Sequence, residues 1–248
     1  MRPGFIDGPK GRLAYERIEG AGPGALWLGG FRSDMTGTKA SRLADWALEQ
    51  GRAYLRFDYS GHGQSGGAFE DCCISDWFAD ACVAFDRLTE GPQILVGSSM
   101  GGWIACLLAL ARPQRVAGIV FIAPAPDFTE ELMWKGMSAA DRETLLREGR
   151  LELPSEYSPE PDVITRQLIE DGRDNLVLPR AGGITCPVRI LQGMKDADVP
   201  WRHAMRLAEA LGSADLRVTL TGDGDHRLSS PADLERLAAS VEEIDDAI

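Results

Sequence analysis

Short apolar runs of the kind that form buried strands alternate with helical patterns along most of this chain. The strand-type runs are ALWLGG (25–30), AYLRFDYS (53–60), QILVG (93–97), AGIVFIA (117–123), VRILQG (188–193) and LRVTLT (216–221). The helical patterns lie at 38–51, about 75–88, 101–112, about 201–211 and 231–244. Because strands joined through helices form right-handed crossovers, we predict an α/β fold, a mostly parallel sheet with helices on both faces.

Two segments depart from this alternation. RLAYERIEG (12–20) is predicted to form an early antiparallel strand at the edge of the sheet. Between Pro124 and Gly183 the sequence has several helical patterns and no convincing strand. At 248 residues with 44% apolar content, the chain can bury one large core. We therefore expect a single domain over residues 1–248, with a helical lid inserted above the strand ends at about 125–183.

One strand run leads directly into a glycine-flanked serine pair. QILVG continues as Gly97-Ser98-Ser99-Met100-Gly101, which is the G-x-S-x-G pattern, and a helical pattern follows at once. Reactive groups in an α/β sheet lie beyond the carboxyl ends of its strands. In a strand-to-helix elbow the central residue has a strained backbone that only small neighbours tolerate. Ser99 is therefore the predicted nucleophile, and Ser98 is expected to be a packing residue.

A nucleophilic serine also needs donors for the oxyanion that forms when it attacks a carbonyl. The start of a helix provides free N–H groups and the positive end of a dipole, so the Met100 N–H is one expected donor. The second is expected from the turn after the strand at 25–30, where the Phe31 N–H is the best candidate.

The general base must come from the three histidines of the chain. His62 precedes Ser99, whereas in this fold class the partners follow in the order Ser, Asp or Glu, His. His203 lies inside a helical pattern, where a surface or packing role is expected. His226 lies in the loop GDGDHRLSS, between the last strand and the last helix, so it is the predicted base.

The acid must then lie between Ser99 and His226, also at a strand end. Asp196 comes first after VRILQG and begins the pattern D-x-x-V-P, so we select it. Asp198 is the alternative, although its position favours a cap on the following helix. Asp223 and Asp225 lie too close to His226 in sequence to orient its ring and are expected to be turn residues.

Two further patterns have competing interpretations. GHGQSG (61–66) formally matches the dinucleotide fingerprint G-x-G-x-x-G, but five residues follow before any helix can begin, so a tight turn beside the site is favoured.

In the lid segment, Leu132, Met133, Trp134 and Met137 form an apolar cluster. This cluster is either ordinary helix core or, if it faces inwards, an apolar pocket for an acyl chain.

Composition excludes several classes of partner. A net charge of −12 argues against nucleic acid, which is bound mostly through Lys and Arg. The five cysteines follow no C-x-x-C spacing, which indicates a reducing compartment and no zinc site. The N-terminal residues 1–13 have no export or transit pattern, and no apolar stretch reaches membrane-spanning length. We therefore expect a cytoplasmic protein without a membrane span.

Several segments together carry a family resemblance. They are FRSDMTGTKA (31–40), RFDYSGHGQS (56–65), GPQILVGSSMGGW (91–103), LPSEYS (153–158), GMKDADVPW (193–201) and DHR (225–227). These segments resemble the α/β-hydrolase subfamily whose animal mitochondrial member is a palmitoyl-protein thioesterase and acyl-glucuronide esterase. The resemblance implies a catalytic triad, which carries over onto Ser99, Asp196 and His226, and a substrate that is an acyl ester or thioester.

These observations predict a serine hydrolase that works through an acyl-enzyme, with no metal and no cofactor, on a small-molecule or acylated substrate. A lactonase or a carbon-carbon bond hydrolase would use the same triad and is the alternative among enzymes. A binding protein that kept the fold and lost the chemistry is the alternative from another class.

Overall fold

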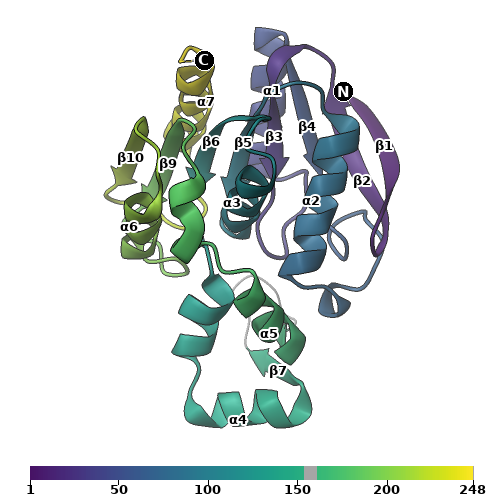
Figure 1. Cartoon of the computed structure of the whole chain (residues 1–248), viewed down its shortest axis with the longest axis vertical. Helices are drawn as coiled ribbons and strands as arrows, with labels where there is room; N and C mark the ends of the chain where they lie inside the picture. The colour runs from purple at the N-terminus through teal and green to yellow at the C-terminus, as the bar shows by residue number, and fades with distance from the viewer. Residues whose placement is uncertain (154–160, 248) are drawn as a thin grey trace.

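The computed structural model describes residues 1–153 and 161–247. An eight-stranded sheet forms its centre, in the order β1-β2-β4-β3-β5-β6-β9-β10 (Figure 1). The strands are β1 (Arg2–Gly8), β2 (Gly11–Ile18), β3 (Ala21–Leu28), β4 (Arg52–Phe57), β5 (Gln93–Ser98), β6 (Val116–Ile122), β9 (Val188–Gly193) and β10 (Leu216–Thr221). From β4 to β10 neighbouring strands are parallel, whereas β2 pairs antiparallel with both β1 and β4.

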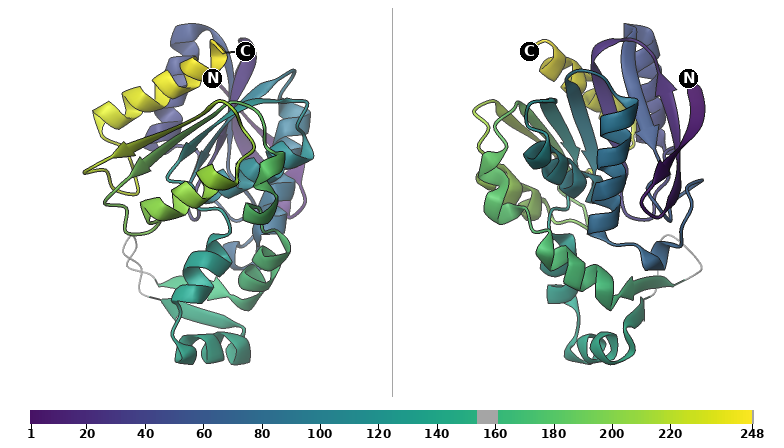
Figure 2. Two further views of the ribbon diagram at one scale, coloured as in Figure 1. Left: turned by 60° about the vertical axis from the view of Figure 1, so that its left-hand side comes forward. Right: turned by 45° about the vertical axis from the view of Figure 1, so that its right-hand side comes forward.

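Helices cover both faces of this sheet, as the two views of Figure 2 show. One face packs against α1 (Thr38–Gln50) and α7 (Pro231–Asp245). The other packs against α2 (Ile74–Leu88), α3 (Met100–Ala111) and α6 (Trp201–Ala210). The predicted α/β architecture is confirmed. Among the helices in the described ranges, none is both long enough and apolar enough to cross a membrane.

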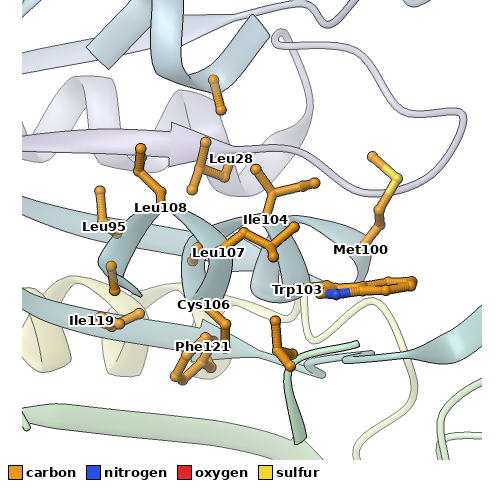
Figure 3. Close-up of a cluster of buried hydrophobic side chains, with 14 of the residues drawn as sticks. Leu28, Leu95, Met100, Trp103, Ile104, Cys106, Leu107, Leu108, Ile119 and Phe121 are labelled. Carbon is orange, nitrogen blue, oxygen red and sulfur yellow. The ribbon is translucent and has the colours of Figure 1, made fainter. Parts of the chain in front are cut away.

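Helix α3 is held deep in the molecule because it is apolar on nearly every side. Figure 3 shows its Ile104, Leu107 and Leu108 packed with strand side chains that include Leu95 and Ile119. All five side chains are buried. Burial of this many apolar groups, at about 25 cal/mol per Å² of apolar surface, fixes the position of the first residue of α3. The carboxyl end of β5 and the start of α3 are therefore a rigid junction.

The N-terminal strands correct one expectation. The segment 12–20 was expected at the edge of the sheet, and β2 is antiparallel as predicted, but β1 covers its outer side and is the edge strand. The sequence of β1, RPGFIDG, contains Pro and two Gly residues and its side chains are mostly exposed. Its pairing is stabilised by backbone hydrogen bonds rather than by a buried face, so it has no readable apolar period.

The segment between β6 and β9 lies beyond one end of the strands (Figures 1 and 2). Its elements are a π-helical turn (Thr129–Trp134), α4 (Ala139–Glu148), β7 (Arg150–Leu153), β8 (Asp162–Thr165), α5 (Arg166–Asp174) and a 3-10 turn (Leu178–Gly183). The expectation that this interval has no strand is wrong, because β7 and β8 form an antiparallel pair. Strands of four residues are too short for an alternating pattern to be recognised.

Candidate active site

Ser99 occupies a sharp junction between β5 and α3. It has φ 54° and ψ −117°, a conformation that costs a non-glycine residue about 1–3 kcal/mol. The two flanking glycines leave the space that this turn needs. A Cβ atom at Gly97 would lie 2.5 Å from the Gly101 carbonyl oxygen, and one at Gly101 would lie 2.0 Å from the Leu28 carbonyl oxygen. The G-x-S-x-G spacing is thus a steric requirement of the junction.

Loops that follow two other strands bring their side chains to Ser99. Asp196 follows β9, and His226 lies between β10 and α7. The His226 Nε2 atom is 3.2 Å from Ser99 Oγ, and His226 Nδ1 is 2.8 Å from Asp196 Oδ2. The Asp196 side chain is fully buried and the His226 side chain is about one-fifth exposed (22%). The three residues selected from the sequence therefore form one hydrogen-bonded chain.

The Asp196 carboxylate accepts hydrogen bonds on both oxygens. Its Oδ1 atom accepts from the backbone N–H groups of Asp198 at 3.0 Å and Val199 at 2.8 Å. Its Oδ2 atom accepts from Gln192 Nε2 at 3.0 Å in addition to His226. The sequence reasoning missed Gln192, although a lone amide at the end of the apolar strand VRILQG was the available signal.

Asp198 lies near the start of helix α6, which begins after Pro200. The helix cap expected of Asp198 stays a prediction. Ligand atoms of Asp196, Asp198 and His226 all lie within 4.8 Å of one another, which makes this group the candidate cation site of the described residues. Within it, however, His226 Nδ1 and Asp196 Oδ2 are already bonded to each other. Asp225 accepts the Leu228 N–H, as expected of a turn residue.

The other two histidines are buried and bonded to other groups. His203 Nε2 lies 2.7 Å from the Pro126 carbonyl oxygen, which agrees with the packing role expected for it. His62 Nε2 accepts the Arg32 N–H at 3.2 Å, and its Nδ1 lies 3.2 Å from the Ser60 carbonyl oxygen. Burial lowers the pKa of His62 to about 4, so this ring is neutral at physiological pH.

The two residues expected to donate to the oxyanion come from different elements near Ser99. Met100 is the first residue of α3 and directly follows Ser99. Phe31 follows β3 in the segment 29–37, here named the oxyanion loop after the donor expected from it, and lines the same cavity as Ser99. At Gly30 the backbone passes so close that an added Cβ would be 3.5 Å from Ser99 Cβ. The backbone of the oxyanion loop is thus in position to face the serine.

The GHGQSG motif forms a turn that supports the oxyanion loop. Asp58, just before it, accepts the Met35 N–H at 2.7 Å and the Gln64 N–H at 2.8 Å. At Gly63, which has φ 46°, a Cβ would lie 2.2 Å from Asp58 Oδ2, so only glycine fits. This geometry agrees with the tight turn expected from the sequence, and the glycine at position 63 allows the close packing against Asp58.

Arg32, in the oxyanion loop, is a strained residue that the sequence reasoning did not single out. Its φ of 56° is left-handed, which costs a non-glycine residue about 1–3 kcal/mol. Its Nε atom lies 3.2 Å from Asp162 Oδ1 on β8, with both side chains about one-third exposed. An ion pair as exposed as this one contributes about 0–1 kcal/mol. The pair by itself does not offset the strain.

A cavity of about 790 Å³ opens above Ser99, within the size range of small-molecule sites. Apolar and polar side chains both line it. The apolar lining residues are Phe31, Ala125, Phe128, Leu132, Met133, Leu153, Ile164 and Val199, and the polar ones include Arg32, Ser33, Asp34, Thr38, Lys39, Asp162, Asp198, Arg227 and Ser229.

The apolar cluster expected in the lid segment contributes to the cavity and to a separate core. Leu132 and Met133 line the cavity. Met133, Trp134 and Met137 pack against a small core whose buried members are Leu145, Leu151, Ile164 and Ile169. The cluster thus includes core residues, and its use as an acyl pocket stays a prediction.

The chain matches a family model described as serine aminopeptidase, S33, over residues 33–168. It is 37% identical to the mitochondrial palmitoyl-protein thioesterase ABHD10 of Bos taurus, over 95% of this chain and 77% of the relative. A putative hydrolase from Agrobacterium vitis S4 superposes with a TM-score of 0.93 at 45% identity, covering 98% of each chain. Mouse alpha/beta hydrolase domain-containing protein 10 superposes with a TM-score of 0.92 at 34% identity, covering 100% of this chain and 99% of that one.

The comparison corrects the expected location. A cytoplasmic protein was expected because residues 1–13 have no export or transit pattern. This expectation is wrong, because the matching curated relatives from Bos taurus, Mus musculus and Homo sapiens are mitochondrial proteins. The absence of a recognised pattern at one end of a sequence does not establish a compartment.

Proposed function

Because the chain belongs to the α/β-hydrolase family, in the group of the ABHD10 thioesterases, and is an ester and thioester hydrolase, we propose that it works through a triad of Ser99, His226 and Asp196. The observation that carries this proposal is the chain of hydrogen bonds from Ser99 Oγ through both nitrogens of His226 to Asp196. The serine in this chain of hydrogen bonds lies at a strained elbow beneath a large cavity.

In the first half of the reaction, His226 Nε2 takes the hydroxyl proton as Ser99 Oγ attacks the acyl carbonyl carbon. Asp196 accepts the Nδ1–H of His226, which keeps Nε2 free as the base and stabilises the imidazolium that forms. The backbone N–H groups of Phe31 and Met100 donate to the oxyanion, where fixed dipoles lower the barrier most.

In the second half, His226 gives its proton to the departing alcohol or thiol, and the acyl group stays on Ser99 as an ester. The same histidine then removes a proton from water, which attacks the acyl-enzyme and releases the carboxylic acid. Every proton in this cycle is carried by a residue of the chain, so the proposed mechanism requires neither a metal nor a cofactor.

The proposed substrate is an acyl thioester or ester with an extended acyl chain. The curated ABHD10 relatives are palmitoyl-protein thioesterases, and the apolar lining residues of the cavity suit an aliphatic chain. The leaving group would lie against the polar lining residues. We also propose that the whole chain is one domain in which residues 125–183 are the lid, since they contribute most of the apolar lining residues.

Steady-state hydrolysis of p-nitrophenyl esters, acyl thioesters and lactones tests this function. We expect turnover of octanoyl esters and thioesters, and a loss of at least about 10⁴-fold in kcat for Ser99→Ala with the fold intact. Ser240→Ala is the matched control, because its Oγ atom bonds within α7. Turnover of lactones alone would favour the lactonase alternative, and no turnover of any ester would favour a binding protein.

A further inference from the structure

The strained conformation of Arg32 is held from the protein side by His62. The Arg32 backbone N–H donates to His62 Nε2 at 3.2 Å. Since Nε2 accepts, the ring proton is on Nδ1, which donates to the Ser60 carbonyl oxygen. The ring is packed against Phe69 and Trp77. The peptide that joins Phe31 to Arg32 is therefore fixed against a rigid, neutral acceptor.

The side chain of Arg32 connects this same peptide to the lid. Its Nε atom is 3.2 Å from Asp162 Oδ1, and its Nη2 atom donates to the Val163 carbonyl oxygen at 3.4 Å. Both partners belong to β8. The guanidinium also lies over the Phe69 ring, 4.4 Å from its centroid. Within the described residues, Arg32 thus contacts the core through its backbone and the lid through its side chain.

Stability does not explain an arginine at this position. Glycine would adopt the left-handed conformation without strain and would keep the N–H that His62 accepts. Arginine gains instead a partly exposed ion pair, a long hydrogen bond to Val163 and a contact with the Phe69 ring, which together do not exceed the strain. A residue kept in a strained conformation at a functional loop indicates a role in function.

We propose that Arg32 is a positioning residue that couples the lid to the oxyanion loop. The contact with β8 determines the orientation of the peptide that joins Phe31 to Arg32. The next N–H group along the backbone, that of Phe31, is the proposed oxyanion donor. When β8 is in place, the donor faces the oxyanion. When β8 moves away, the loop loses that constraint. This inference rests on the proposed function.

Four single variants and one double variant, assayed on p-nitrophenyl octanoate, test the coupling. Arg32→Gly removes the side chain and the strain, whereas Arg32→Ala removes the side chain alone. Asp162→Asn removes the lid partner. Glu170→Gln is the matched control, because Glu170 forms a lid ion pair at the same 3.2 Å with Arg166, away from the oxyanion loop.

We expect kcat to fall about tenfold in Arg32→Gly, Arg32→Ala and Asp162→Asn, with KM changed by less than about threefold, because a displaced oxyanion donor acts on the transition state. Arg32→Gly should melt about 2–4 °C above Arg32→Ala, so that activity follows the lid contact and not stability. The double variant Arg32→Ala with Asp162→Asn should fall no further than either single variant, and Glu170→Gln should keep wild-type kcat.

Three results would overturn the coupling. They are wild-type kcat in Arg32→Gly, wild-type kcat in Asp162→Asn, and a change in KM alone. Ser99→Ala in the same assay separates this proposal from the one on which it rests. If Ser99→Ala retains hydrolysis, the proposed triad is wrong and the coupling falls with it. If Ser99→Ala is inactive but Arg32→Gly is fully active, only the coupling is wrong.

Discussion

Gln192 Nε2 lies 3.0 Å from Asp196 Oδ2, the same oxygen that accepts from His226. The other neighbours of Nε2 are the carbonyl oxygens of Gly193 and Val199, so the amide nitrogen must face the carboxylate. The Oε1 atom of Gln192 is buried without a partner. An unpaired buried oxygen costs about 1–3 kcal/mol, which suggests that the amide is retained for its effect on Asp196.

Gln192→Met keeps the volume of the side chain and removes the donor. We expect kcat to fall about tenfold, because the Asp196 carboxylate loses a hydrogen bond that holds it beside His226. Steady-state hydrolysis of an activated ester measures this effect. Gln93→Met is the control, because this buried amide donates to the carbonyl oxygens of Glu90 and Pro92, and wild-type kcat in Gln192→Met would contradict the role.

Gly101→Ala tests the steric account of the elbow. The added Cβ would lie 2.0 Å from the Leu28 carbonyl oxygen, so α3 must shift. We expect the free energy of unfolding to fall by about 3 kcal/mol in urea titrations. Gly136→Ala is the control, because an added Cβ there meets nothing within 4 Å. Equal stability of the two variants would show that the junction is less tightly packed than described.

His62 makes the free energy of unfolding decrease as the pH falls. Burial lowers its pKa to about 4 in the folded state, below the ordinary value of 6.5, so the unfolded chain binds the additional proton between these values. Its contribution to stability is complete above about pH 6.5 and is lost as the pH falls through 4.

Urea unfolding of the wild-type protein and His62→Gln at two pH values isolates this group from the other titrating residues. Between pH 7 and pH 4.5 the wild-type protein should lose about 2 kcal/mol more than His62→Gln. An identical loss in both proteins would mean that His62 is not held neutral by burial.

Leu132→Trp tests the acyl pocket. Leu132 is one of the apolar lining residues of the cavity, and a tryptophan there would occupy space that the account assigns to the distal part of an acyl chain. We expect kcat/KM for the octanoyl ester to fall at least about tenfold, while the acetyl ester changes by less than about twofold. Leu146→Trp is the control, because Leu146 is an exposed leucine of α4. Equal losses on both esters would place the acyl chain elsewhere.

The parts of the fold that could be predicted from the sequence depend on local pattern. The strands of the parallel sheet are continuous apolar runs, and the elbow at Ser99 needs only near neighbours. His226 could be selected because only three histidines compete for the role. The structure then places it within hydrogen-bond distance of Ser99 and Asp196.

The parts that could not be predicted depend on distant contacts or on very short elements. Strands β7 and β8 have four residues each, and β1 is stabilised by backbone pairing. Arg32 meets a partner 130 positions along the chain, in Asp162. Its left-handed backbone carries no residue signature, because a strained residue is one that its local sequence does not favour.

Intact-mass spectrometry after reaction with a fluorophosphonate tests the central claim most directly. Such a probe forms a stable bond only with a serine that a base has activated. We expect one adduct on the wild-type protein, none on Ser99→Ala, and labelling of His226→Ala slowed by at least about 10³-fold. An adduct that persists in Ser99→Ala would show that another serine is the nucleophile and would contradict the account.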